Sequence, residues 1–261
     1  MKTSVGALVA RRDLLYMITW REIRIKYKQS VMGMLWAILM PAVIVSAGVV
    51  VRYGFSIIAH VPLAVEDIAA VSVRAVPWAF FISSIRFATN SLVANTSLVT
   101  KIALPREVFP VAAMLSQFAD FVVASLVLTV FLAVLGVGVS VQLLWVPALV
   151  IVLVVLTTGL GILLSAASLF FRDVKYIVEV VLTFAIFFTP VFYDAQMFGR
   201  WAPALMLNPV APLLEGLSNV IVKQAAPPLE WLGYSAIVSL VTLAIALSAF
   251  YKLDPYFAES V

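Results

Sequence analysis

The chain has 261 residues, of which 64% are apolar and 11% are charged, and its formal net charge is +4. Globular domains carry about 25% charged residues, so a soluble protein of this composition would lack a polar surface. The mean hydropathy is +1.13, and the apolar residues form runs close to the roughly 20 residues that cross a bilayer as a helix. The sequence therefore predicts an all-α integral membrane protein.

Residues 1–30 predict a helix that lies in the plane of the lipid headgroups, before the first span. Four aromatic or apolar residues recur at i, i+4, i+7 and i+11 and would share one helix face. They are Tyr16, Trp20, Ile23 and Tyr27. Arg21 lies away from this face and would meet anionic headgroups while the aromatic face enters the lipid. A simple basic anchor is one alternative, and the apolar alternation over residues 23–27 would also fit a strand.

Six apolar runs predict six membrane spans, which we place near 31–51, 75–98, 109–135, 143–170, 176–192 and 231–250. An even number of spans puts both termini on one side of the membrane. With cytoplasmic termini, the inner segments hold twelve basic residues and the outer segments hold four. The inner residues are Lys2, Arg11, Arg12, Arg21, Arg24, Lys26, Lys28, Lys101, Arg106, Arg172, Lys175 and Lys252; the outer ones are Arg52, Arg74, Arg200 and Lys223. The positive-inside rule therefore favours cytoplasmic termini.

The segment between the second and third spans, "TKIALPREVFP" at 100–110, brings charges and two prolines into this apolar chain. With the termini inside, it faces the cytoplasm. Pro105 suits the first turn of a short helix, where its missing N–H would be unbonded anyway, and Pro110 suits the start of the next span. A plain capped turn between two helices is the alternative.

Residues 193–230 form a long outer segment that is too apolar for a solvated loop. Its helix-like stretch from Pro209 to Val222 is too short to cross the bilayer, and such stretches are typical of re-entrant or interfacial elements. The preceding span is short and ends in Thr189-Pro190. We predict a folded-back pair of short helices between the last two spans; a loop with one amphipathic surface helix is the alternative.

Three ionisable residues lie within the predicted spans, namely Arg86, Asp120 and Glu179. Such groups cost several kcal/mol in a membrane unless they are paired or hydrated. Arg86 lies among hydroxyl and amide side chains, so we expect its side of the helix to face a wet cavity or another subunit. We expect Asp120 to hydrogen-bond a neighbouring helix, whereas Glu179 suits the positive end of its own helix.

Catalytic motifs are absent from the sequence. There is no cysteine, no phosphate-binding G-x-x-x-x-G-K-[ST] loop, and a single histidine, His60. The Gly136/Gly138 and Gly159/Gly161 pairs more simply allow close helix contact. We therefore expect no catalytic residue, metal site or bound cofactor in this chain, and any ATP would be bound by another chain.

Aromatic residues gather within the spans and at their ends. Most membrane Trp and Tyr residues belong to interfacial belts, which is the simpler interpretation. Aromatic faces can also stack on sugar rings, so the same residues could line a glycan channel. The channel or gate candidates, with two polar neighbours, are Trp36, Trp78, Phe81, Arg86, Asn90, Phe188 and Tyr193.

Four stretches of the chain resemble permeases of the ABC-2 type polysaccharide exporters. They are "YKQSVMGMLWAILMPAVIV" at 27–45, "LVANTSLVTKIALPREVFPVAAMLSQFADF" at 92–121, "FRDVKYIVEVVLTFAIFFTPVFY" at 171–193 and "LNPVAPLLEGLSNVIV" at 207–222. The resemblance implies a homodimer around a central channel in the bacterial inner membrane, with two separate ATPase subunits that use ATP and Mg²⁺. It implies export of a lipid-linked polysaccharide such as O antigen, and no nucleic-acid partner. It also implies an N-terminal interfacial helix, six transmembrane helices and a re-entrant helical pair between the last two spans.

The resemblance further implies that residues 99–109 form a coupling helix that enters a cleft in the ATPase. The residues assigned to it are Lys101, Leu104, Pro105, Arg106, Glu107, Val108 and Phe109. Arg106 and Glu107 would make polar contacts, and the apolar residues would fill the cleft. The alternatives are export of a small drug or lipid, an intramembrane lipid-linked sugar transferase, and a non-catalytic scaffold.

Overall fold

The computed structural model describes residues 12–28, 32–33, 35–60, 62, 64–101 and 105–257. Within these ranges all the regular structure is helical, as predicted, and no strand is present. Five helices are long and apolar enough to cross a membrane. They are α3 (Leu35–Ala59), α4 (Val65–Ala94), α6 (Val108–Val134), α7 (Val146–Phe170), which the 3₁₀ helix η1 (Val141–Trp145) precedes, and α11 (Leu229–Leu253).

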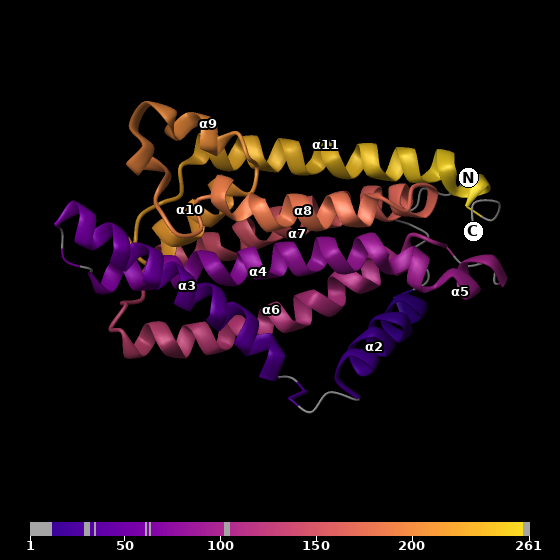
Figure 1. Cartoon of the computed structure of the whole chain (residues 1–261), viewed down its shortest axis with the longest axis horizontal. Coiled ribbons are helices and arrows are strands. Elements are labelled where there is room, and N and C mark those ends of the chain that lie inside the picture. Colours follow the sequence, from indigo (N-terminus) through magenta and orange to yellow (C-terminus); the bar gives the residue numbers. More distant parts are fainter. Residues whose placement is uncertain are drawn as a thin grey trace.

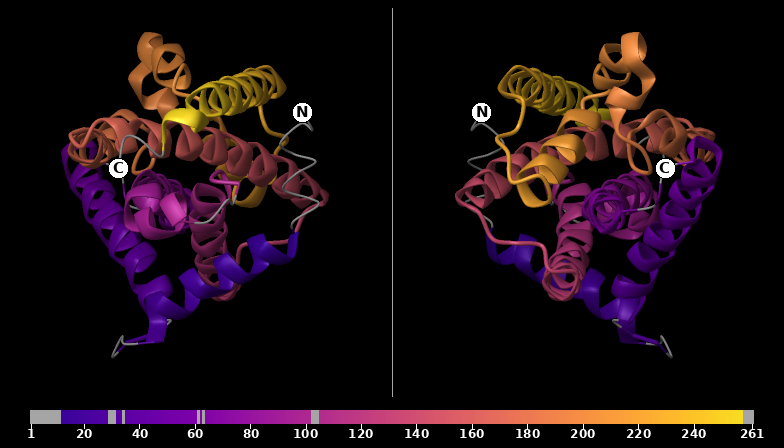
Figure 2. Two further views of the ribbon diagram at one scale, coloured as in Figure 1. Left: turned by 90° about the vertical axis from the view of Figure 1, so that its right-hand side faces the viewer. Right: turned by 90° about the vertical axis from the view of Figure 1, so that its left-hand side faces the viewer.

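Helix α4 is the centre of an elongated bundle (Figures 1 and 2). It contacts α3, α6 and α7 along its length, and most of its residues are buried. Aromatic packing fills the space around it: the Phe80 ring lies 5.8 Å from the Phe118 ring and 5.1 Å from the Phe121 ring of α6. The fold therefore surrounds one helix, most of whose residues are buried, including the polar Ser72, Arg74, Ser84 and Thr89.

Helix α4 begins at Val65, whereas the sequence predicted a span from about residue 75. Glu66 and Asp67 occupy its first turn, where carboxylates suit the positive end of a helix. The prediction was wrong here because charged residues from 66 to 74 were assigned to an outer loop. The structure keeps them on the helix, where Asp67 pairs with Arg52 of α3 and Arg74 pairs with Asp194.

The predicted span at 176–192, the fifth of the six apolar runs, is not among the five long helices. It forms α8 (Val174–Ala185) and a 3₁₀ turn, η2 (Ile186–Phe188), beside α4 and α7. At 1.5 Å per residue, α8 is about 18 Å long, well short of a hydrocarbon core of about 30 Å. The chain leaves the helix at Thr189, as the Thr-Pro pair predicts.

Residues 193–230 are packed at the end of the bundle that we name the α10 end. They contain η3 (Ala195–Trp201), α9 (Ala202–Met206) and α10 (Ala211–Ile221). Helix α10 is buried against α4, α7 and α11, whereas α9 stands out from the bundle (Figure 1). A solvated loop with one surface helix does not describe this segment. The opposite end, which carries α5 (Thr96–Lys101) and the last turn of α11, is named the α5 end.

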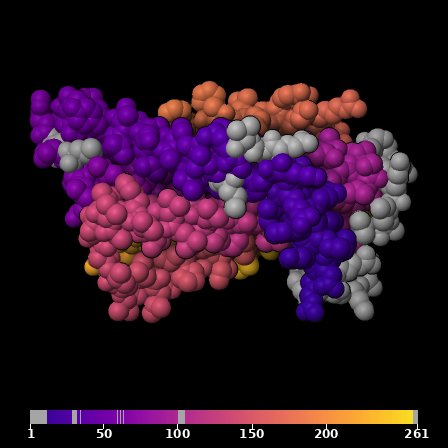
Figure 3. Space-filling model, turned by 90° about the horizontal axis from the view of Figure 1, so that it is seen from below, coloured from indigo at the N-terminus to yellow at the C-terminus, as the bar shows by residue number. Residues whose placement is uncertain are grey.

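The N-terminal segment forms α2 (Arg12–Lys28), so the strand alternative is wrong. The first eleven residues lie outside the described ranges. Helix α2 lies across α6 rather than along the bundle, as Figures 1 and 3 show. A crossing orientation of this kind is what an interfacial helix requires.

The Gly159/Gly161 pair permits close helix contact, as predicted. A Cβ on Gly159 would lie 2.8 Å from the Leu243 backbone nitrogen of α11, and one on Gly161 would lie 2.8 Å from the Ala88 Cβ of α4. The interpretation was wrong for Gly136 and Gly138, which follow the end of α6 in a turn. Gly136 adopts φ = 77° there, a conformation that glycine allows at no steric cost.

We predict that Gly159→Ala destabilises the purified protein. The added methyl group meets helix backbone rather than a movable side chain, and overpacking of this kind costs about 1–3 kcal/mol. The measurement is the midpoint of thermal unfolding in detergent. The matched control is Gly233→Ala in α11, where a Cβ meets nothing within 4 Å. Equal midpoints for the two variants would contradict the close approach of α7 and α11.

Candidate functional site

The predicted coupling segment lies at the α5 end, where α5 follows a break at Asn95 (Figure 1). The side chain of Lys101 and all of Leu104 lie outside what the structure describes. Description resumes at Pro105. Residues 105–107 form a turn where the sequence predicted the first turn of a short helix, and α6 begins at Val108, close to the predicted start of the span near residue 109. Pro110 lies in the first turn of α6, as the sequence predicted.

Hydrogen bonds and an ion pair connect the turn at residues 105–107 to the C-terminal end of α11. The Arg106 guanidinium donates to the backbone oxygen of Asp254, lies 3.1 Å from its Oδ1, and stands 5.7 Å from the centre of the Phe257 ring. The Tyr251 hydroxyl donates to Glu107 Oε1 over 3.3 Å. A displacement of this segment would therefore act directly on α11 and on η4 (Asp254–Tyr256).

Val108 and Phe109 do not fit the prediction that they fill a partner's cleft. They are 0% and 1% exposed and pack in a core cluster with Ile162 and Phe250. The physical reason is that they form the first turn of a long helix that packs against α2, α4 and α7. Of the described side chains between Thr96 and Phe109, those of residues 96–98, Pro105 and Arg106 are at least partly exposed, whereas Glu107, at 5%, is buried and so does not fit its predicted contact with a partner either.

Helix α2 is tied to the bundle by polar contacts at two places. Arg21 donates to Asn95 at the end of α4 and to Glu22. Further along, the Lys26 ammonium donates to Gln117 Oε1 over 2.9 Å and pairs with Asp120, which also accepts from the Tyr27 hydroxyl. Partial burial and Asp120 together raise the pKa of Tyr27, so it stays a neutral donor. The prediction that Asp120 bonds a neighbouring helix is confirmed.

Two of the four residues of the predicted lipid-facing side, Tyr16 and Trp20, lie on the outward side of α2, whereas Tyr27 turns to Asp120 of α6. Tyr16 and Trp20 are exposed and stacked, with ring centres 6.4 Å apart. The Arg24 guanidinium stands 5.4 Å from the centre of the Trp20 ring. This arrangement presents aromatic rings with a cation beside them, as expected of a surface that meets headgroups.

The channel candidates divide into two groups. Trp36, Arg86, Asn90 and Phe188 are exposed on the surface of the chain. Trp78, Phe81 and Tyr193 are at most 9% exposed, so as lining residues they were predicted wrongly. The Trp78 and Phe81 rings stack 5.6 Å apart inside the bundle, and the Tyr193 hydroxyl donates to the Phe187 carbonyl over 2.8 Å. Polar and apolar residues are mixed around α4, so its sequence does not show which aromatic rings face outward.

Arg86 and Glu179 form an ion pair between α4 and α8, with 2.7 Å between Nε and Oε1. Their side chains are 47% and 46% exposed. The pair lies on an apolar surface, because α8 and η2 present a row of exposed apolar residues. This row consists of Tyr176, Ile177, Val180, Val181, Phe184 and Phe187.

The sequence analysis missed a buried ion cluster at the α10 end. Arg74 is 1% exposed; it pairs with Asp194, donates to the carbonyls of Tyr193 and Pro190, and has Nη1 3.8 Å from Glu215 Oε1. Glu215 Oε1 also accepts from the Ala195 backbone N–H over 2.8 Å. No local pattern pointed to it, because Arg74 and its partner Asp194 are 120 residues apart in the sequence.

Arg52 of α3 extends this cluster. It pairs with Asp67 of α4 and lies 4.0 Å from Asp194. We name Arg52, Asp67, Arg74, Asp194 and Glu215 the α10-end ion cluster. It joins α3, α4 and α10 to the segment that follows η2. Among the described residues, no group of three His, Cys, Asp or Glu side chains is placed to bind a metal.

We predict that Arg74→Leu destabilises the protein strongly, because it leaves Asp194 and Glu215 without their buried cation. Removing one partner of a buried pair costs about 3–5 kcal/mol. Thermal unfolding in detergent measures the effect. The control is Arg200→Leu, which removes an exposed arginine from the same segment of the chain. Similar behaviour of the two variants would contradict the structural role of Arg74.

Comparison with known proteins gives a consistent result. Residues 13–222 match the model of the family described as ABC-2 type transporter. Two proteins of Klebsiella pneumoniae named O-antigen export system permease protein RfbA are each 28% identical to the chain, over 99% of it and 98% of their own length. A protein of the same name from Myxococcus xanthus is also 28% identical, over 98% of both chains.

Proposed function

Because this chain belongs to the ABC-2 type transporter family, we propose that it is the membrane permease of an ATP-driven exporter of lipid-linked polysaccharide, with O antigen as the substrate. The observation that carries this proposal is the similarity to three O-antigen export permeases along almost the whole of both chains. The chain is a permease subunit and not itself a catalytic domain. We propose that two copies of a separate ATPase subunit bind ATP and Mg²⁺ and drive transport.

We propose that the α5 end faces the cytoplasm of a bacterium and that the chain crosses its inner membrane six times. The five long helices supply five crossings, and α8 with η2 supplies the sixth. Residues 193–230, with α9 and α10, then form the outer re-entrant pair, and α2 lies in the inner headgroup layer. The distribution of basic residues supports this orientation.

We propose that α5 and the turn at Pro105 couple the permease to the ATPase. Two helices support this segment. Arg106 and Glu107 bond to residues at the end of α11, and Val108 begins the buried first turn of α6. A push from the ATPase would therefore move α6 and α11 together instead of bending a loop. Within residues 99–109, the surface residues contact the ATPase. The buried Val108 and Phe109 transmit the movement to α6.

We propose that the face made by α3, α4 and α8 meets a second copy and lines the glycan path. A half-exposed ion pair on a lipid-facing surface would be costly, so the Arg86–Glu179 pair requires a second chain or water beside it. Trp36, Asn90 and Phe188 are exposed as well. Aromatic rings and a neutral ion pair together suit a polymer of hydroxyl groups.

The test of the whole proposal is co-purification with a candidate ATPase, followed by export of O antigen in cells that lack the native permease. Stable association and restored surface glycan are expected. Purified chain that never retains an ATPase would overturn the proposal.

Arg106→Ala should lower export about tenfold, the effect of roughly 1.4 kcal/mol on the coupled step. The reason is that the coupling segment loses its attachment to Asp254 and Phe257. Nucleotide binding by the ATPase should be unchanged. Arg200→Ala at the α10 end is the matched control and should export normally. Normal export by Arg106→Ala would remove the coupling assignment.

Exchange of the charges at Arg86 and Glu179 tests the proposed path. Arg86→Glu and Glu179→Arg should each reduce export, because each puts two like charges on one face of the chain. The double variant restores an ion pair and should recover most of the activity. Recovery would show that a neutral pair is what the path requires, whereas a double variant as inactive as the singles would contradict it.

A further inference from the structure

A buried aromatic ring holds the segment that follows α11 against the bundle. Pro255 ends the helix, because it lacks an N–H and its ring would clash with the preceding turn, and the chain then turns through η4. Phe257, which comes next, is 0% exposed. Its ring lies 5.0 Å from the ring of Phe250 in α11 and 5.6 Å from the ring of Phe170 at the end of α7. Phe257 therefore joins the segment after η4 to the ends of two helices.

Phe257 belongs to a packed core that lies at the α5 end, which we name the α5-end core. This core is separate from the larger cluster of buried residues around Trp78. It takes buried residues from every helix that reaches the α5 end, among them Ile18 of α2, Leu92 of α4, Val99 of α5, Val108 of α6, Ile162 of α7 and Phe250 of α11. The proposed coupling segment and the segment after α11 thus share one interior.

The turn at residues 105–107 meets this segment through the Arg106 guanidinium. One nitrogen of the guanidinium lies 3.1 Å from Asp254 Oδ1, and its central carbon stands 5.7 Å from the centre of the Phe257 ring. A cation within about 6 Å of a ring centre is attracted to the ring. Asp254 and Phe257 therefore hold the same cation, one through an oxygen and the other through an aromatic face.

The two partners of Arg106 are not equally firm. The Asp254 side chain is 47% exposed, so water competes for its oxygens, and exposed ion pairs of this kind are weak. The Phe257 ring is buried between Phe170 and Phe250 and cannot move away without opening the α5-end core. Of the two contacts, the one with Phe257 is better suited to keep the guanidinium in place when the turn is pushed.

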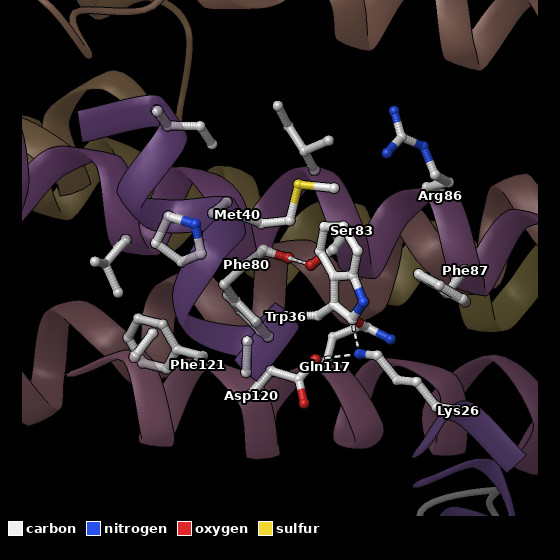
Figure 4. A pocket seen from close by; sticks show the side chains of 17 residues that line it. Lys26, Trp36, Met40, Phe80, Ser83, Arg86, Phe87, Gln117, Asp120 and Phe121 are labelled. Atoms are coloured by element: carbon white, nitrogen blue, oxygen red, sulfur yellow. Dashed lines mark hydrogen bonds and ion pairs between the residues drawn. The ribbon is translucent and has the colours of Figure 1, made fainter. Parts of the chain in front are cut away.

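The two helices that support the coupling turn are joined to it in different ways. Helix α6 continues the chain directly from the turn, and further along it is joined to α2: Figure 4 shows the Lys26 ammonium beside Gln117 and Asp120. Helix α11 packs along α7, and its end meets the turn across space, through Asp254 and Phe257 among other residues. A movement of the turn therefore reaches α6 through the backbone but reaches α11 through side-chain contacts.

We propose that Phe257 is a positioning residue for coupling: it holds the Arg106 guanidinium in place and so transmits the movement of the coupling turn to α11. The inference rests on the proposed coupling role of residues 99–109 and adds a residue that lies outside them. Phe257 does not itself touch the ATPase or the glycan in this proposal. It acts through Arg106.

The first test compares Phe257→Ala with Tyr256→Ala in cells that lack the native permease. Surface O antigen per permease molecule in the membrane should fall about tenfold in Phe257→Ala, while ATP hydrolysis by the purified permease–ATPase complex continues. A loss of folded protein would lower the amount of permease and not the export per molecule. Tyr256→Ala removes a ring that is 57% exposed from the adjacent position; it is the matched control and should export normally. Normal export per molecule by Phe257→Ala would overturn the proposal.

A double-mutant cycle tests whether Phe257 acts through Arg106. Independent effects multiply, so the variant with both Arg106→Ala and Phe257→Ala would export about a hundredfold less if the two residues acted separately. If Phe257 acts by holding Arg106, the double variant should stay near the roughly tenfold loss of each single variant. A hundredfold loss would contradict the inference.

Phe257→Leu separates the aromatic ring from the packing of the core. Leucine keeps an apolar side chain in the core, where such exchanges cost little stability, so the midpoint of thermal unfolding in detergent should stay close to that of the unmodified chain. Because leucine offers Arg106 no aromatic face, export per molecule should still fall about threefold. Full export by Phe257→Leu would show that packing alone is required and would overturn the role of the ring.

The outcomes also separate this inference from the proposed function. Reduced export by Arg106→Ala together with normal export by Phe257→Ala would refute the role of Phe257 and leave the coupling turn in place. A chain that retains no ATPase would refute the proposed function instead.

Discussion

The need to pair every cation that lies between apolar helices organises this structure. Arg74 with Asp194, Arg86 with Glu179, Lys26 with Asp120 and Arg106 with Asp254 each join elements far apart in the sequence. An unpaired charge in a low-dielectric setting costs more than a broken neutral contact. Each pair therefore specifies which helices meet, in a bundle whose apolar surfaces could slide past one another.

The length and spacing of the apolar runs were enough to predict the all-helical class, the long helices and the break at Thr189. The start of α4 was not predictable in this way, because Arg74 becomes tolerable only through Asp194, which lies 120 residues later. The candidate site was predicted only in part, because its geometry also depends on contacts between residues that are far apart in the sequence. The exposed Trp36 and the buried Trp78 look alike in sequence, and only the packing around α4 separates them.

The two ends of the molecule are built differently. At the α5 end, the turn at Pro105 is held by contacts to the end of α11, and α2 is held by Asn95 and Asp120. At the α10 end, the buried cluster around Arg74 fixes the segment after η2 to α3, α4 and α10. A bundle fixed at both ends but joined by apolar contacts between them can tilt its helices without losing its polar anchors.

The shortness of α8 has a consequence for the polymer itself. With η2 it covers residues 174–188, about 22 Å of helix, against a hydrocarbon core of about 30 Å. With α8 as the proposed sixth crossing, the apolar layer beside the path would be about 22 Å thick instead of about 30 Å. A hydrated chain moving along this wall would have to shed its water shell over only a few sugar units at a time.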